Sequence, residues 1–335
     1  PQGLAQMAAL CQAVTTEFEN VPAEALAHFQ QHMPVAPGPS AVRVAQDRAL
    51  EKAHFVRCGV PVAPHRVIHD ASELAQVQDD LLPGILKTTR LGYDGKGQVR
   101  VATLAELTAA WQQLQSNGPT VCILEKRLPL AAECSVVLAR GFDGHMVHLP
   151  LQVNLHRDGI LAVTEVFEQA LPVATEQQAL QAAYEVARGL NYVGVLCVEF
   201  FVVQDGPDRD ALGPLVVNEI APRPHNSGHH TIEIARCSQF EQHLRAILNL
   251  PLGDTSLHSA GAMLNLVGEK GYDGPVVYEG LEEVLQIPGV HPHLYGKAQT
   301  KPFRKMGHVT ISAPNMTEVR SKAEKVKNTI RVVSK

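Results

Sequence analysis

Hydrophobic and polar positions along the chain follow two different periods. Short runs rich in Val, Ile, Leu and Phe, which are typical of β-strands, occur at 121–124, 135–140, 148–153, 195–203 and 215–220. Between them, apolar residues recur at helical spacing, first at Leu180, Ala183, Tyr184, Ala187 and Leu190 and again at Phe240, Leu244, Ile247 and Leu248. This alternation predicts an α/β or α+β architecture with mixed sheets.

Capping residues and breakers indicate where the helices and domains begin. Thr103 with Glu106, and Thr175 with Gln178, form capping boxes, and 317–335 is expected to be a polar, basic helix. Pro and Gly clusters at 34–39 and 251–259 interrupt the pattern. We therefore expect three domains: 1–45, 46–250 and 251–335.

Composition narrows the class of protein. The chain has 335 residues, of which 45% are hydrophobic and 19% charged, and it lacks the run of about 18 apolar residues that would span a membrane. A formal net charge of -5 argues against a nucleic-acid partner. The six cysteines form no C-x-x-C pair, which favours reduced thiols in the cytoplasm.

The first candidate site is a strand that ends in Lys87 and runs into a glycine-rich loop. Glycine allows backbone N–H groups to approach phosphate oxygens, and Lys87 and Lys96 supply countercharge. Asp94-Gly95 is also a β-hairpin signal, and the two interpretations are compatible because a hairpin tip can close over a triphosphate. The segment does not match a P-loop.

Two further candidates involve carboxylates. The strand-like segment that contains Glu125, followed by Glu133, could offer backbone groups to adenine and a carboxylate to ribose, although any edge strand looks the same. Glu199 and Glu219 each interrupt an apolar strand. Because buried carboxylates need a cation, the pair predicts a Mg²⁺ site shared with nucleotide phosphates; the alternative is that they face solvent.

The fourth candidate is the Pro- and Gly-containing loop 221–230, which follows Glu219 directly. Its donors favour binding of an anion or a ribonucleotide, with Arg223 on a phosphate. Zinc bound by His225 and His229 is disfavoured, because a four-residue spacing aligns them only in a helix. A fifth, basic cluster at 295–297 and 304–308 could equally be ordinary charged surface.

These segments together resemble the ATP-grasp superfamily, and within it the N5-carboxyaminoimidazole ribonucleotide synthase family. The resemblance covers nearly all of the chain. It is carried by 17–22, 46–52, 92–98, 154–161, 192–195, 218–229, 238–247, 293–297 and 304–308, among which 218–229 and 304–308 are the most specific.

The resemblance implies a role for each matching residue. Those implied to line an ATP site are Arg48, Lys87, Gly92, Tyr93, Asp94, Gly95, Lys96, Gly97, Gln98, Glu125, Lys126, Arg127, Leu128, Glu133, His156, Asn218 and Glu219. Glu199 and Glu219 are implied to bind Mg²⁺. Those implied to face bicarbonate or the ribonucleotide are Tyr93, Asp94, Arg223, His225, Asn226, Ser227, Lys297, Arg304 and Lys305.

The same resemblance implies the chemistry. Bicarbonate would attack the γ-phosphate of ATP, and the exocyclic amine of 5-aminoimidazole ribonucleotide would then take the carboxyl group. A cytoplasmic homodimer is implied as well. Alternatives are a sister ATP-grasp ligase, such as formate-dependent glycinamide ribonucleotide transformylase or a biotin carboxylase, and a nucleotide-binding chain without turnover.

The family fold implied is ATP-grasp, with a nucleotide-fold-like N-terminal domain and a small β-rich C-terminal domain. Pro1 stands inside a helical pattern, and the glycine-rich first turn of the family's N-terminal domain does not occur in this sequence. We therefore expect residues 1–45 to be a truncated remnant of that domain. The expected consequence is binding of ATP and Mg²⁺ with poor carboxylation.

Overall fold

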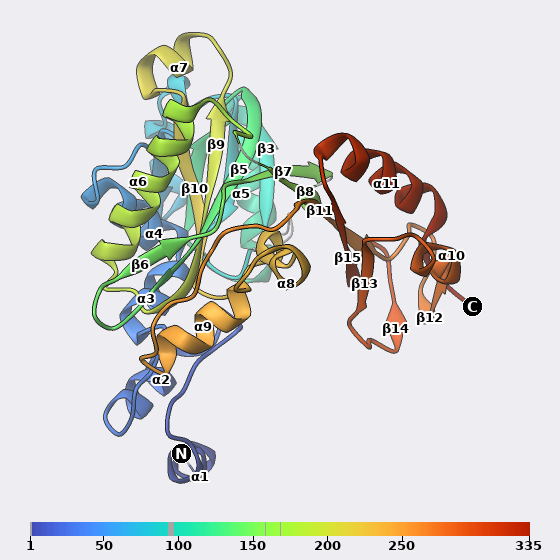
Figure 1. Ribbon diagram of the computed structural model, residues 1–335. Coiled ribbons are helices and arrows are strands. Elements are labelled where there is room, and N and C mark those ends of the chain that lie inside the picture. The colour runs from blue at the N-terminus through green and yellow to red at the C-terminus, as the bar shows by residue number, and fades with distance from the viewer. Residues whose placement is uncertain (1, 93–96, 158, 168) are drawn as a thin grey trace.

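A computed structural model describes residues 2–92, 97–157, 159–167 and 169–335 (Figure 1). The helices are α1 (Gln2–Leu10), α2 (Ala23–Gln30), α3 (Pro39–Ala45), α4 (Arg48–Arg57), α5 (Leu104–Leu114), α6 (Val173–Gly189), α7 (Pro207–Leu212), α8 (Thr231–Ile234), α9 (Gln239–Ile247), α10 (Leu281–Leu285) and α11 (Met316–Thr329). The strands are β1 (His65–Ile68), β2 (Gly84–Thr88), β3 (Gln98–Val101), β4 (Cys122–Lys126), β5 (Leu130–Arg140), β6 (Met146–His148), β7 (Gln152–Arg157), β8 (Ile160–Val166), β9 (Gly194–Val203), β10 (Leu215–Ala221), β11 (Ala260–Val267), β12 (Gly274–Glu279), β13 (Val290–Leu294), β14 (Gln299–Thr300), β15 (Lys305–Ala313) and β16 (Arg331–Ser334).

A nine-stranded sheet connects the body of the molecule to its C-terminal part. Its order is β10-β9-β5-β7-β8-β11-β15-β13, with β6 paired to β5, and its ladders are antiparallel. The pairing of β8 with β11 carries the sheet across 251–259, where the sequence is interrupted by Pro and Gly. In Figure 1 the strands β8 and β11 lie between the body and the C-terminal group, which contains α10, α11, β12, β13, β14 and β15.

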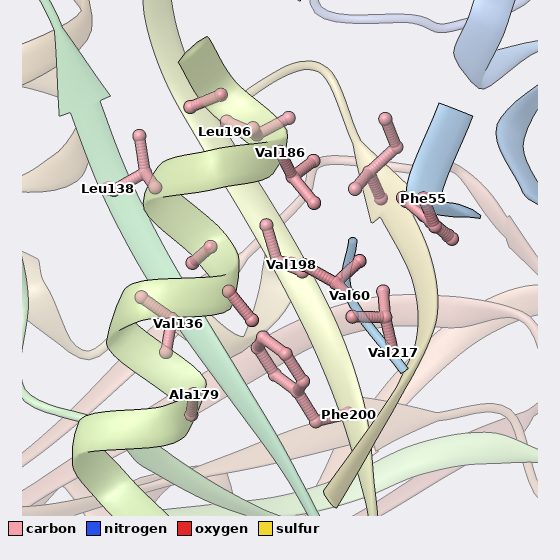
Figure 2. Packing of buried hydrophobic residues seen from close by; sticks show 14 of the residues in the cluster. Phe55, Val60, Val136, Leu138, Ala179, Val186, Leu196, Val198, Phe200 and Val217 are labelled. Carbon is pink, nitrogen blue, oxygen red and sulfur yellow. The ribbon is translucent and has the colours of Figure 1, made fainter. Parts of the chain in front are cut away.

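The main core lies between this sheet and α6. Along β9, Leu196, Val198 and Phe200 point to one face and are buried against Ala179 and Val186 of α6 (Figure 2). The intervening residues of β9 point to the opposite face, because successive side chains of a strand alternate. Residues at odd positions, including Glu199, are therefore directed away from the α6 core.

A four-stranded sheet of order β1-β4-β2-β3 carries the glycine-rich hairpin, and α5 packs on it through Leu107 and Trp111. Lys87 of β2 lies opposite Gln98 of β3, so the predicted hairpin is present. Gly97 has a φ of 67°, and a Cβ there would lie 2.7 Å from Thr88 Oγ1, so both its backbone and its surroundings require glycine. Residues 93–96 of the predicted loop lie outside the described residues.

The C-terminal part has its own core. Helices α10 and α11 pack on β11, β13 and β15 through residues such as Val284, Val319 and Val326, and β12 pairs with β14 and β16 in a three-stranded sheet. No helix in the described ranges has the length and apolar character needed to cross a membrane.

Four expectations about local structure are wrong. The run 148–153 is divided between β6 and β7, and Thr175 lies inside α6, whose N-cap is Pro172. The basic tail ends in β16 after α11. On α9, Phe240, Leu244 and Leu248 are exposed, whereas Gln239, Gln242 and His243 are buried, because these polar side chains bind backbone groups of neighbouring segments.

Candidate active site

A cavity of about 580 Å³ lies over the face of the nine-stranded sheet opposite α6 and is bordered by the glycine-rich hairpin. The structure brings many of the sequence-predicted residues to its wall. They are Arg48, Lys87, Gly92, Gln98, Arg127, Leu128, Glu133, His156, Glu199, Asn218, Glu219, Arg223, His225, Asn226 and Lys305.

Paired charges lie under the floor of the cavity. Glu125 of β4 is buried and its carboxylate lies 3.0 Å from Lys87 Nζ and 3.5 Å from Lys52 Nζ. Burial alone would raise the pKa of Glu125, but Lys52 and Lys87 lower it to about 2. The carboxylate therefore stays ionised and holds both lysines, of which Lys87 extends into the cavity.

A bulge in β10 directs its polar residues at the cavity. The register with β9 shifts between Val217 and Ile220, which leaves Asn218 and Glu219 out of the ladder. Two residues of α4 satisfy the freed backbone groups: Lys52 Nζ donates to Asn218 O at 2.7 Å, and Ile220 N donates to Glu51 Oε1 at 2.8 Å. Burial raises the pKa of Glu51 to about 8.

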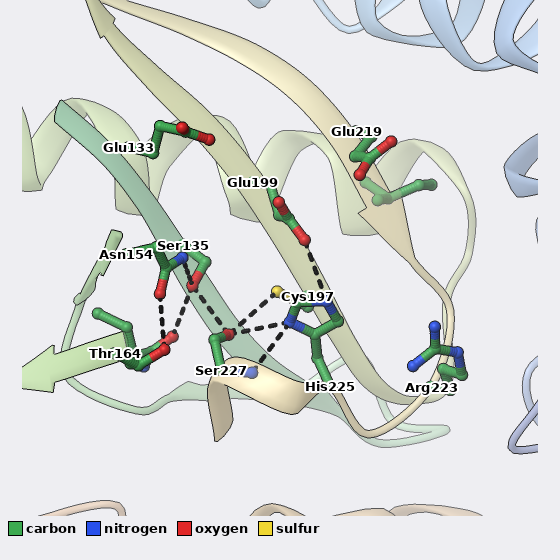
Figure 3. A network of polar contacts seen from close by, with 12 residues as sticks. Glu133, Ser135, Asn154, Thr164, Cys197, Glu199, Glu219, Arg223, His225 and Ser227 are labelled. Atoms are coloured by element: carbon green, nitrogen blue, oxygen red, sulfur yellow. Dashed lines mark hydrogen bonds and ion pairs between the residues drawn. The ribbon is translucent and has the colours of Figure 1, made fainter. Parts of the chain in front are cut away.

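The two candidate metal ligands, Glu199 and Glu219, lie on neighbouring strands and both line the cavity. Each is already associated with a cationic group. His225 Nε2 is 3.0 Å from Glu199 (Figure 3), and an Arg48 guanidinium nitrogen is 3.7 Å from Glu219. Burial would raise the pKa of Glu199, but His225 lowers it. Two carboxylates at a polar cavity are a donor set that suits Mg²⁺.

The loop after β10 is fixed by Gln239 of α9. His225 N donates to Gln239 Oε1 at 2.8 Å, and Gln239 Nε2 donates to His225 O at 2.7 Å. A Cβ on Gly228 would lie 2.5 Å from Gln239 Oε1, so the close approach requires glycine there. His225 Nδ1 also lies 2.9 Å from Ser227 Oγ. His225 is therefore fixed at its backbone by Gln239 and at its two ring nitrogens by Glu199 and Ser227.

Electrostatics keep His225 charged. Burial lowers its pKa, but the Cys197 sulfur and the Glu199 carboxylate raise it to about 10. Beside it, Arg223 forms an ion pair with Glu19, whose pKa is lowered by that contact against the effect of burial. Within the described residues, the buried side-chain amide of Asn226 has no hydrogen-bond partner, so both of its polar atoms are free for a ligand.

Other sequence-predicted residues lie next to the cavity rather than in its lining. Glu125 lies beneath it, Ser227 lies behind His225, and Lys126 pairs with Asp208 at 2.6 Å. Lys297 Nζ donates to Lys305 O at 2.6 Å, and Arg304 donates to Gln299 O at 2.8 Å. Gly97 supports the hairpin, while Tyr93, Asp94, Gly95 and Lys96 lie outside the described residues.

Four residues that shape the site were not among the candidates: Glu19, Glu51, Lys52 and Gln239. All four belong to segments that carry the family resemblance, and Gln239 directly follows the Ser238 N-cap. A charged pair such as Glu51-Lys52 within a helix normally suggests a solvated face. Here both side chains are buried, at 3% and 1% exposure, because they bind the β10 bulge.

Comparison with known proteins gives consistent matches. Family models match residues 53–240 (ATP-grasp domain), 261–322 (phosphoribosylaminoimidazole carboxylase C-terminal domain) and 1–46 (ribonucleotide synthetase preATP-grasp domain). The N5-carboxyaminoimidazole ribonucleotide synthase of Brucella melitensis is 42% identical over 315 residues, which are 94% of this chain and 83% of that protein.

Solved structures agree with this result. The N5-carboxyaminoimidazole ribonucleotide synthetase of Thermus thermophilus matches with a TM-score of 0.84 and 37% identity, covering 100% of this chain and 85% of that one. The Aspergillus clavatus synthase, in complex with ADP and 5-aminoimidazole ribonucleotide, matches with a TM-score of 0.85 and 29% identity, covering 98% of this chain and 84% of that one.

The fold, the cavity and these matches define an ATP-grasp ligase, an enzyme that binds ATP. More narrowly, the chain belongs to the N5-carboxyaminoimidazole ribonucleotide synthase family of purine biosynthesis. The family and the ATP-grasp fold that the sequence resemblance implied are thereby confirmed.

Proposed function

We propose that this chain uses ATP and Mg²⁺ to carboxylate 5-aminoimidazole ribonucleotide with bicarbonate, giving N5-carboxyaminoimidazole ribonucleotide, ADP and phosphate. One observation carries the proposal: a single cavity contains the basic Arg48 and Lys87, the carboxylates Glu199 and Glu219, and the loop that bears His225. Phosphoryl transfer to a small anion needs these three groups together, because charge develops on the transferring group.

The ATP end of the cavity is assigned to the hairpin and α4. Arg48 and Lys87 bind phosphate oxygens. Residues 125–128 bind adenine, and Glu133 binds the ribose. The ion pair of Glu133 with His156, at 3.1 Å, supports a defined position for the ribose-binding carboxylate. Glu199 and Glu219 hold Mg²⁺, which when bound neutralises charge on the phosphates.

The other end of the cavity is assigned to bicarbonate and the ribonucleotide. Arg223, His225, Asn226 and Lys305 line it. Bicarbonate oxygen attacks the γ-phosphorus and ADP leaves, which gives carboxyphosphate. Its C–O bond then breaks to release phosphate and CO₂, and the exocyclic amine of the ribonucleotide attacks the CO₂ carbon and loses a proton, which gives the carboxylated product. His225 and Lys305 stabilise the anions, and the family resemblance gives Tyr93, Asp94, Ser227, Lys297 and Arg304 a role toward the same substrates.

The remaining assignments are proposals of the same kind. The domains are 1–45, 46–250 and 251–335, and the chain acts in the cytoplasm. It forms a homodimer, which is supported by the exposed apolar residues Phe240 and Leu244 of α9 and Leu248 at its C-cap, a surface that a second copy would cover. Light scattering of the purified chain tests the dimer, and a monomer at all concentrations would contradict it.

Phosphate release with different substrate pairs tests the proposed activity. We expect ATP hydrolysis that depends on both bicarbonate and 5-aminoimidazole ribonucleotide, and a carboxylated product. Formate with glycinamide ribonucleotide should give only background release. Turnover with that second pair would contradict the proposal and indicate a transformylase. Phosphate release that depends on neither pair would indicate an ATPase without carboxylation activity.

A further inference from the structure

Cys197 stands two residues before Glu199 on β9, and both point to the face opposite α6. His225 reaches the same point from the loop after β10. The thiol sulfur, a carboxylate oxygen and a ring nitrogen of these residues all lie within 4.8 Å of one another. Figure 3 shows the three side chains converging, two from β9 and one from the loop after β10.

These three ligand types together are unlike a magnesium site. Mg²⁺ selects oxygen ligands, whereas a thiolate with an imidazole and a carboxylate suits Zn²⁺. Zinc sites with three protein ligands leave a fourth position open. Glu199 and His225 line the cavity, so that position would face the substrates.

We infer that Cys197, Glu199 and His225 form a Zn²⁺-binding site inside the cleft, and that its occupation inhibits the enzyme. The site differs from a Mg²⁺ site on Glu199 and Glu219 in using the thiol and the imidazole. It also differs from the disfavoured pairing of His225 with His229, because Cys197 takes the place of the second histidine.

The surroundings of the three residues favour this role. His225 Nδ1 lies 2.9 Å from Ser227 Oγ, and Ser227 is held in turn by Ser135 at 2.9 Å. A partner on the second ring nitrogen orients a histidine ligand and is usual around bound zinc. The backbone clamp by Gln239 fixes the same residue. The site is therefore largely preformed.

Charge balance favours a divalent ion as well. One thiolate and one carboxylate neutralise Zn²⁺, while the protons carried by the thiol and the imidazole leave to solvent. The open fourth position can take water or a phosphate oxygen. Occupation removes Glu199 from Mg²⁺ and His225 from the substrates, so zinc stops turnover; this consequence rests on the proposed function, whereas zinc binding does not.

Cobalt binding tests the site without reference to activity. Co²⁺ takes zinc positions, and a cysteine ligand gives it a thiolate-to-cobalt charge-transfer band. We expect this band when Co²⁺ alone is added to the full chain, and its loss when Zn²⁺ is added. The band should disappear in Cys197→Ala and in Cys197→Ser, which keeps the size of the side chain.

Cys134 provides a matched control. It is a buried thiol on the neighbouring strand β5, but it belongs to the core cluster on the α6 face of the sheet. Cys134→Ala should keep the charge-transfer band. Absence of the band in the unsubstituted chain, or its persistence in both Cys197 variants, would overturn the site.

A zinc titration at fixed Mg²⁺ and ATP then tests inhibition. Each protein is compared with its own zinc-free activity, and we expect Cys197→Ala to need at least about 10-fold more zinc for half-inhibition than the unsubstituted chain. Equal inhibition of both proteins would overturn the inference. Cobalt binding without inhibition would support the site and would overturn the proposed role of Glu199 in turnover.

Discussion

Single side chains set the charge balance of the cleft. Glu199 and Glu219 interrupt apolar strands at positions where an uncompensated carboxylate would be costly. The structure places a cationic group against each of them, His225 and Arg48. In the proposed mechanism Mg²⁺ takes over part of this compensation when ATP binds.

Glu199→Gln and Glu219→Gln are expected to lower Mg²⁺-dependent turnover by at least about 100-fold, because each removes charge needed at the phosphates but keeps the shape of the side chain. Steady-state phosphate release checks this, with circular dichroism to confirm folding. Glu185→Gln on the outer face of α6 is the control and should be neutral. Near-normal turnover of either cleft variant would remove that residue from the metal site.

Lys52→Met is expected to lower the free energy of unfolding by roughly 3–5 kcal/mol, because it deprives the buried Glu125 carboxylate of one of its two cations. Lys126→Met breaks the more exposed pair with Asp208 and should cost about 1 kcal/mol or less. Urea denaturation measures both values. Equal decreases in the free energy of unfolding would contradict a larger contribution of the buried Lys52–Glu125 pair.

Secondary-structure elements differ in how far the sequence predicts them. The strands β9 and β10 and their carboxylates were predictable, because an apolar run interrupted by Glu is visible without knowledge of its partners. The buried face of α9 was not predictable from the sequence. Apolar spacing pointed to Phe240, Leu244 and Leu248, but burial of Gln239 and Gln242 depends on the backbone of His225 and Gly253, segments that only the fold brings close.

The two glutamines of α9 allow a matched experiment. Gln239 clamps His225 with two hydrogen bonds, and Gln242 clamps Gly253 in the same way, at 2.8 and 2.9 Å. Gln239→Leu and Gln242→Leu should both lower stability, by about 1–3 kcal/mol each, because buried backbone groups lose their partners.

We expect Gln239→Leu alone to lower kcat, by on the order of 100-fold, because displacement of the His225 loop misplaces the reacting groups. Gln242→Leu should keep kcat near that of the unsubstituted chain. Measurement of kcat below the unfolding transition separates the two effects. Equal kcat values for both variants would contradict a positioning role for Gln239.

At the scale of the whole molecule, acid sensitivity follows from buried histidines. Burial lowers the pKa of His230 and His243 to about 4, and burial with neighbouring histidines lowers that of His308 to about 3. In the unfolded chain these groups titrate near a pKa of about 6.5. Below that pH the unfolded state binds more protons than the folded state. The free energy of unfolding therefore falls as pH falls from about 6.5 to about 4.

His243→Asn is expected to make this dependence shallower by up to about 1.4 kcal/mol per pH unit. His243 Nδ1 accepts from Val195 N at 3.0 Å, a hydrogen bond that Asn can keep. Unfolding free energies at about pH 6 and about pH 5 give the slope. Glu51, with its raised pKa, acts in the opposite direction but equally in both proteins. The exposed His145→Asn is the control; an unchanged slope in His243→Asn would contradict the assignment.

The fate of bicarbonate oxygen tests the central claim most directly. The chain would be incubated with ¹⁸O-labelled bicarbonate, ATP, Mg²⁺ and 5-aminoimidazole ribonucleotide, and the products analysed by mass spectrometry before exchange with water. If bicarbonate oxygen attacks the γ-phosphorus in this cleft, the phosphate released carries one ¹⁸O and the new carboxylate carries two. Phosphate without label, formed at the same rate as product, would show that water is the attacking group and would contradict the account.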